Sequence, residues 1–168
     1  MTSEIVKNVK LLLNDKRVDP SDDNNWAIKL ASQNGHVEIV KLLLKDNRVN
    51  PSDNNWATRF ISKNRNIDIV KLLLKNKRVN PSDNNNWAIQ LASQNGHVDI
   101  VKLLLKDKRV NPSDEYNLAI KLASDIGYFD IVNLLWQDQK VKDTLKIDDK
   151  ELYNELIKND IKDKIEDF

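Results

Sequence analysis

The sequence contains no cysteine and only three glycines among its 168 residues. Without cysteine, a disulfide framework and a thiolate metal site are both excluded. So few glycines leave no glycine-rich loop for phosphate binding, and no nucleophile, base and orienting group form a recognisable catalytic pattern. No apolar run approaches the ~20 residues that span a bilayer, and the first residues lack the apolar core of a signal peptide. We therefore expect a cytoplasmic protein that is not an enzyme and carries no cofactor or metal.

Charge of either sign is abundant but balanced. The chain has 27 lysines and arginines against 26 acidic residues, which leaves a formal net charge of +1. A total this close to zero predicts no long-range attraction to nucleic acid or to an anionic membrane. We expect neither of them as a partner, and we expect the protein to be a monomer.

The most informative feature that is present is an internal repeat. The segment 26–44 returns almost unchanged as residues 87–105, and it returns more loosely twice more. Leucine triplets begin at Leu11, Leu42, Leu72 and Leu103, and a Leu-Leu-Trp segment begins at Leu134, so the spacing is 31, 30, 31 and 31 residues. A fixed period of this length indicates one supersecondary unit stacked on copies of itself.

Each repeat is predicted to contain two helices. In the second copy, a short helix runs from Trp26 to about Gln33, and Gly35 follows where a helix ends with positive φ. A second helix runs from Val37 to about Lys45, with a wide apolar face typical of a helix covered on both sides. An extended Arg-Val-Asn-Pro-Ser-Asp connector leads to the next repeat. Asparagines that precede the first helices are expected to be N-caps: Asn25, Asn55, Asn86 and Asn117.

Residues 30–44, LASQNGHVEIVKLLL, and residues 91–105 resemble the L-A-A-x-x-G-H-x-E-V-V-K-L-L-L core of the ankyrin repeat nearly residue for residue. The resemblance covers about residues 3–143 and implies an all-α solenoid of helix–turn–helix repeats with short extended connectors. The family's T-P-L-H opening is replaced by Trp-Ala-Ile-Lys at 26–29. Short asparagine-rich repeats with this connector are similar to those of ankyrin proteins in giant DNA viruses of amoebae, and a viral source would place the protein in host cytoplasm.

We predict a single array over residues 1–168. Residues 1–22 form an N-terminal half-repeat cap, residues 23–52, 53–82, 83–113 and 114–142 are full repeats, and residues 143–168 are a C-terminal cap. The third copy lacks the repeat glycine and histidine, which favours a local distortion in which Asn64 supplies the left-handed residue. In the C-terminal stretch, Tyr153, Ile157, Ile161 and Ile165 are spaced for one helix or for two broken near Asn159. A cap is favoured over a helix offered to a partner's groove.

Three columns of residues are candidate sites. His36 and His97, two repeats apart, cannot share a metal ion, and a helix-start hydrogen bond is the favoured role for both. The tryptophans at 26, 56 and 87, continued by Leu118, are favoured as core rather than as exposed binding anchors. The third column is one arginine per repeat: Arg17, Arg48, Arg78 and Arg109. A phosphate-binding stripe is conceivable, but pairing with the acids that follow (Asp22, Asp53, Asp83 and Asp114) is favoured.

The resemblance implies a non-catalytic module that binds an intracellular protein, a host protein if the source is viral, on the concave face of the array. Positions that differ between copies are the candidate contacts. These are Gln33, Asn34, Arg59, Lys63, Gln90, Gln94, Glu115, Tyr116, Lys121, Asp125 and Ile126. Tyr116, Ile126 and nearby Tyr128 are the least polar group and the predicted hot spot. The alternatives are the substrate-recognition part of a ubiquitin-ligase-type adaptor, with a recruiting tail after residue 143, and a structural or self-associating array.

Overall fold

The computed structural model describes residues 2–52, 56–63 and 66–166, and within them the side chains of residues 4–159. The described residues form helices and no strand, which confirms the predicted all-α class. None of their helices is both long and apolar enough to cross a membrane. The chain divides into two compact units, Met1–Pro81 and Ser82–Phe168. The predicted repeat boundaries remain predictions.

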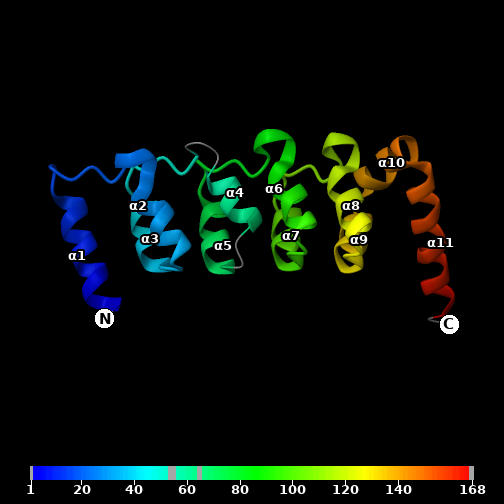
Figure 1. Cartoon of the computed structure of the whole chain (residues 1–168), viewed down its shortest axis with the longest axis horizontal. Helices are drawn as coiled ribbons and strands as arrows, with labels where there is room; N and C mark the ends of the chain where they lie inside the picture. The colour runs from blue at the N-terminus through cyan, green and yellow to red at the C-terminus, as the bar shows by residue number, and fades with distance from the viewer. Residues whose placement is uncertain (1, 53–55, 64–65, 167–168) are drawn as a thin grey trace. The chain divides into compact units, whose positions relative to one another are not determined.

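Short helices follow one another along the chain (Figure 1). The first unit contains α1 (Thr2–Asn14), α2 (Asp22–Gln33), α3 (Val37–Leu43), α4 (Trp56–Lys63) and α5 (Ile67–Lys75). The second contains α6 (Asp83–Gln94), α7 (Val98–Leu105), α8 (Asp114–Ile126), α9 (Phe129–Trp136), α10 (Gln139–Asp148) and α11 (Lys150–Glu166). Each first helix contacts the second helix that follows it: α2 with α3, α4 with α5, α6 with α7, and α8 with α9.

The core of each unit is built mainly from the second helices and the apolar side of the first helices. In the first unit α3 contacts α1 and α5, and in the second unit α7 contacts α9 while α6 contacts α8. Leucines one period apart, Leu43, Leu73, Leu104 and Leu135, are therefore buried. Leu12 stands in the same column on α1 but is 53% exposed. The reason is that α1 has the sequence of a second helix without a first helix paired to it.

A left-handed turn precedes three of the first helices. Within the first turn of α2, three consecutive residues have positive φ (Asp23, Asn24 and Asn25, at 50°, 57° and 63°), and the right-handed part of α2 begins after them. The same turn occurs at Asn84–Asn86 and at Glu115–Asn117. A left-handed conformation costs an ordinary L-residue roughly 1–2 kcal/mol, and asparagine is among the residues that tolerate it best. The right-handed helices thus start at Trp26, Trp87 and Leu118, close to the predicted start. Residues 53–55, including the predicted cap Asn55, lie outside the described residues.

The last residue of each left-handed turn is a buried asparagine whose side chain binds residues further along the chain. Asn25 Oδ1 accepts from the backbone N–H of Asn50 at 2.7 Å. Asn86 repeats this bond with the N–H of Asn111 at 2.7 Å, and its Nδ2 donates to Asp114 Oδ2 at 2.8 Å. The predicted N-cap role is therefore wrong at Asn86, because its amide joins the next repeat instead.

Asn117 makes the corresponding contact with the helix that follows its repeat. Its Nδ2 donates to Asp148 Oδ2 at 3.0 Å, and its Oδ1 accepts from Thr144 Oγ1 at 3.0 Å. Both partners belong to α10, so the N-cap prediction is wrong here as well. All three asparagines are at most 5% exposed. Buried amides of this kind need their hydrogen bonds. Asn25 and Asn86 hold the connector that ends their own repeat, and Asn86 and Asn117 also bind the segment that follows it.

The observed helix ends agree with those predicted from the sequence only in part. Gly35, Gly96 and Gly127 have φ of 72°, 71° and 88°, which confirms the predicted left-handed helix ends. His36 and His97 stand at the N-cap positions of α3 and α7, but neither side chain makes a cap hydrogen bond. The predicted helix-start hydrogen bond of the histidines is wrong. In the third copy, Asn64 lies outside the described residues.

The end of the second unit is formed by α10 and by α11, which is one helix without a break near Asn159. α10 contacts α8, α9 and α11. Tyr153 of α11 meets the ring of Trp136 edge-on, with 5.6 Å between ring centroids. Leu156 is buried beside them, so α11 turns an apolar face towards the repeats. The side chains of Ile161 and Ile165 lie outside the described residues.

Replacement of Asn86 by alanine tests the link between repeats. We expect the free energy of unfolding to fall by about 2–4 kcal/mol, because the Asn111 N–H and the Asp114 carboxylate lose their partner and alanine tolerates positive φ poorly. Urea denaturation measures the change. The matched control is Asn86→Gly, which loses the same bonds but accepts the backbone conformation and should lose less stability. An alanine variant as stable as the wild type would contradict the linking role.

Candidate functional site

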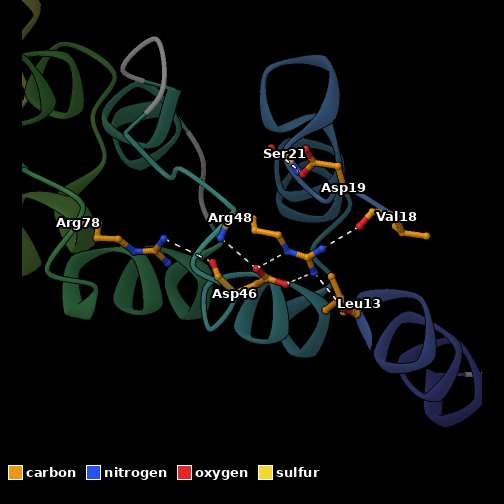
Figure 2. A network of polar contacts seen from close by, with 7 residues as sticks. All are labelled: Leu13, Val18, Asp19, Ser21, Asp46, Arg48 and Arg78. Atoms are coloured by element: carbon orange, nitrogen blue, oxygen red, sulfur yellow. Dashed lines mark hydrogen bonds and ion pairs between the residues drawn. The ribbon is translucent and has the colours of Figure 1, made fainter. Parts of the chain in front are cut away.

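The arginine column belongs to the structure of the repeats. In Figure 2, the guanidinium of Arg48 reaches back to the preceding repeat, where it donates to the carbonyls of Leu13 and Val18, each at 2.9 Å. Leu13 lies in the last turn of α1, whose carbonyls have no partner within the helix. Arg78 does the same one repeat later, donating to the carbonyls of Leu44 at 2.7 Å and of Val49. Arg48 and Arg78 thus satisfy carbonyls at the end of the previous helix.

The acids that pair with these arginines precede them. Arg17, Arg48 and Arg109 each form an ion pair at 2.6 Å with the aspartate two residues earlier: Asp15, Asp46 and Asp107. Local pairing was predicted, but Asp22 and Asp114 were the wrong partners for Arg17 and Arg109. Asp53, predicted for Arg48, lies outside the described residues. A side-chain hydrogen bond from the arginine lowers the pKa of Asp46 and Asp107 below the ordinary 3.8, although burial opposes the shift.

Four of the predicted contact residues belong to the first unit, and three of them line one groove. Gln33, Arg59 and Lys63 are exposed and border a groove of about 440 Å³ between α2 and α4. The other lining residues are Trp26, Lys29, Trp56 and Phe60. Asn34 is also exposed, but its side chain donates to the Leu30 carbonyl at 3.0 Å and caps the end of α2. The structure therefore brings together a coherent part of the predicted site.

The walls of this groove are aromatic and its rim is basic. Trp56 and Phe60 are nearly buried and meet edge-on, with 6.1 Å between ring centroids. Trp26 is 53% exposed, so the prediction of a buried tryptophan column is right at Trp56 and wrong at Trp26. Lys29, Arg59 and Lys63 are the charged residues among the described lining.

In the second unit the predicted contact residues have different environments. Gln90 is buried and its Nε2 donates to the carbonyl of Asn85 at 2.6 Å, so it supports the left-handed turn and is no surface contact. Gln94 and Asp125 are exposed. Lys121 is half-buried and lies 3.8 Å from a carboxylate oxygen of Asp149. The prediction that Gln90 contacts a partner is therefore wrong.

The predicted hot spot is divided between the two ends of α8. Tyr116, which is 75% exposed, and exposed Glu115 occupy the left-handed turn, where the Glu115 carboxylate accepts from Asn85 Nδ2. Ile126 is exposed at the opposite end, about 12 Å from Leu118 at 1.5 Å per residue. Tyr116 and Ile126 therefore do not form one patch.

Along the chain, Ile126 is followed by Tyr128 and Phe129, which are also exposed, and these three apolar residues are called the cluster at the end of α8. A Cβ atom added at Gly96 would lie 2.9 Å from Tyr128 Cζ, so this ring packs directly on the backbone of the previous repeat. Phe129 was missed in the sequence. A bulky ring at the start of α9, where the other copies have Val37, Ile67 or Val98, was the available signal.

No group of three or more histidine or acidic side chains in the described part of the chain is arranged to hold a metal ion. His36 and His97 belong to different units. The side chains assembled in the groove and in the cluster at the end of α8 are aromatic, aliphatic, basic and amide groups. Their chemistry is that of non-covalent recognition.

Replacing Arg78 by alanine removes charge-assisted hydrogen bonds to carbonyls of the preceding repeat. We expect the free energy of unfolding to fall by about 1.5–3 kcal/mol. The matched control is Arg17→Ala, whose side chain is 89% exposed and paired with Asp15 alone, with an expected loss below ~0.5 kcal/mol. Chemical denaturation measures the free energy of unfolding of both variants. Equal losses of stability in the two variants would contradict the structural role of Arg78.

Comparison with known families gives two matches along the chain. A model of ankyrin repeats in three copies matches residues 56–146, more than half of the chain, and a model of the single ankyrin repeat matches residues 23–56. Searches of curated proteins and of solved structures found no match. The similarity of the connectors to those of giant-virus proteins therefore remains a prediction.

Proposed function

Because the chain belongs to the ankyrin repeat family, whose members are generally protein–protein interaction modules, we propose that it is a non-catalytic module that binds an intracellular protein. The binding surface consists of the first helices of the repeats and the left-handed turns before them. In the second unit, Tyr116 contributes from the left-handed turn of α8 and Ile126 from the end of that helix. A host protein is the partner if the chain is viral.

The observation that carries this proposal is the placement of Tyr116. Its φ of 55° is unfavourable for an aromatic residue, and the side chain is 75% exposed, so little packing compensates the backbone cost. The equivalent residues in the other described turns are Asn24 and Asn85, which tolerate this conformation. A strained residue that the fold does not need supports a role in recognition.

The two alternative functions have less support. An adaptor for a ubiquitin ligase would need a recruiting segment in the tail, yet Tyr153 and Leu156 of α11 face the repeats, which favours a cap. A self-associating array would be detected by light scattering of the purified chain. A monomer that captures another protein would favour the interaction module over both.

Affinity capture from the native cytoplasm tests the proposal with a variant that separates binding from folding. Tyr116→Asn combined with Ile126→Ala should lose the captured protein, because both exposed apolar contacts are removed. The Tyr116→Asn replacement by itself should raise the free energy of unfolding by up to about 1 kcal/mol, because asparagine suits the left-handed turn.

The matched control is Ile147→Ala, which truncates an exposed isoleucine on α10 and should retain the captured protein. Equal retention by all variants would contradict the proposed surface, and loss of stability in Tyr116→Asn would contradict the strain argument.

A further inference from the structure

A notch of about 280 Å³ lies between α9 and α11 in the second unit. Phe129, Asn133 and Gln137 line it from α9 and from the residue that follows this helix. They are spaced at i, i+4 and i+8, which places them on one helix face. Glu155 lines the notch from α11. All four residues are exposed, so α11 packs on the repeats without closing the notch.

The last repeat departs from the other copies at the residues that line this notch. Phe129 stands where the other second helices begin with valine or isoleucine. Asn133 and Gln137 stand where each other copy has a lysine. The lysines at the first position are Lys41, Lys71 and Lys102, and those at the second are Lys45, Lys75 and Lys106. This surface has therefore gained an aromatic ring and exchanged two positive charges for amides.

The acidic residues at the notch have no basic partner. In α3, Glu38 lies 4.0 Å from the lysine three residues later, and α5 repeats this pair. Asp130 is the equivalent acid of α9, but three residues later the chain has Asn133. Within the described part of the chain, neither Asp130 nor Glu155 forms an ion pair, although Lys158 is one turn from Glu155. The negative charge here is thus available to a partner.

The walls of the notch suit one kind of side chain. Phe129 is 68% exposed, and a Cβ added at Gly127 would lie 3.9 Å from its Cε2, so the ring rests against the chain and leaves most of its surface open. Lys142 lies 5.0 Å from the ring centroid of Trp136, whereas no described cation lies over Phe129. An arginine stacks on aromatic rings, packs its stem on apolar surface and offers five donors to carboxylate and amide oxygens.

We propose that the notch binds an arginine side chain of a protein partner. Its guanidinium stacks on Phe129 and donates to the Glu155 carboxylate and to the amide oxygen of Asn133. Apolar residues beside the arginine contact the rest of the cluster at the end of α8. This inference rests on the proposed function and specifies the partner's chemistry at one part of the second unit.

The test titrates the isotope-labelled full chain with three short peptides and follows its NMR signals. The peptides carry leucines around a central arginine, around citrulline, which has a similar shape without the charge, or around glutamate. We expect the arginine peptide to cause saturable shifts at Phe129, Asn133 and Glu155 and to bind about fivefold or more tighter than the citrulline peptide. Added salt should weaken this binding.

Substitutions taken from the other copies test the site without disturbing the fold. Asn133→Lys restores the lysine of the other second helices and should weaken binding of the arginine peptide about tenfold or more, because it brings a like charge into the notch. Phe129→Val should weaken it about threefold through the loss of the ring. The matched control is Asn8→Lys, which adds the same charge at an exposed position of α1 and should leave binding unchanged.

The spectrum of each variant shows whether the chain is folded, and the comparison of the arginine and citrulline peptides needs no substitution. Equal affinity for these two peptides, the absence of saturable shifts, or shifts confined to residues outside the notch would overturn the inference. Undiminished binding of the arginine peptide by Asn133→Lys would also overturn it.

Affinity capture with Asn133→Lys separates the two proposals. If the wild type and this variant retain a cytoplasmic protein equally, the protein-binding function stands and the arginine specificity fails. If the wild type retains no protein, the proposed function fails, while selective binding of the arginine peptide at the notch still supports the chemistry of this site.

Discussion

The structure depends on the buried asparagine that ends each described left-handed turn. A side-chain amide carries both an acceptor and two donors, so one residue can bind the connector of its own repeat and, as at Asn86, the start of the next repeat. At Asn25 and Asn86 the amide oxygen receives the backbone N–H of the next connector at the same distance of 2.7 Å. An aspartate would lack the donors, and an aliphatic residue would lack every bond while facing the same positive φ. The recurrence of asparagine therefore has a single physical cause.

Within each repeat, the positions that hold the helices together differ from the positions that vary between copies. The asparagine, the backward-reaching arginine and the leucine column hold successive helices together, and they recur with little change. The first two residues of the left-handed turn and the exposed face of the first helix contribute less to this packing, apart from the hydrogen bond between Asn85 and Glu115. They differ between copies: Asp23 and Asn24 in one turn, Asn84 and Asn85 in another, Glu115 and Tyr116 in a third. Much of the variation thus lies at positions where a side chain is displayed on a rigid support, which is the arrangement that recognition requires.

Much of the fold could be predicted from the sequence because the repeated apolar pattern and the glycine helix ends are local signals. Residues such as Gly35 and Leu43 behave as their spacing indicates. The asparagine was predicted to be an N-cap. This prediction was wrong because an N-cap and a hydrogen-bonded link to a later segment use the same residue type. The distinction depends on which backbone N–H lies within reach, and that is decided by tertiary packing.

The candidate site was harder to predict for the same reason. The position of Gln90 differs between copies, yet the side chain is buried against a left-handed turn that no local sequence pattern predicts. The tryptophan column is uniform in sequence, yet Trp26 is half-exposed while Trp56 is nearly buried, because their neighbours in the stack differ. The only indication of Phe129 in the sequence was that its side chain is larger than those at the equivalent positions of the other copies. Surface exposure is a property of the stack and not of the repeat, so the groove between α2 and α4 could be assembled only from the structure.

Native-state hydrogen exchange at the backbone amide of Asn111 tests the central claim most directly. This amide lies in an extended connector just before a proline, where an exposed N–H would exchange at nearly the rate of an unfolded peptide. The bond to Asn86 Oδ1 predicts strong protection that is lost only together with the unfolding of the repeats around it, and the same holds for Asn50. Fast exchange of Asn111 in the folded protein would show that the asparagine side chain does not hold the connector between repeats.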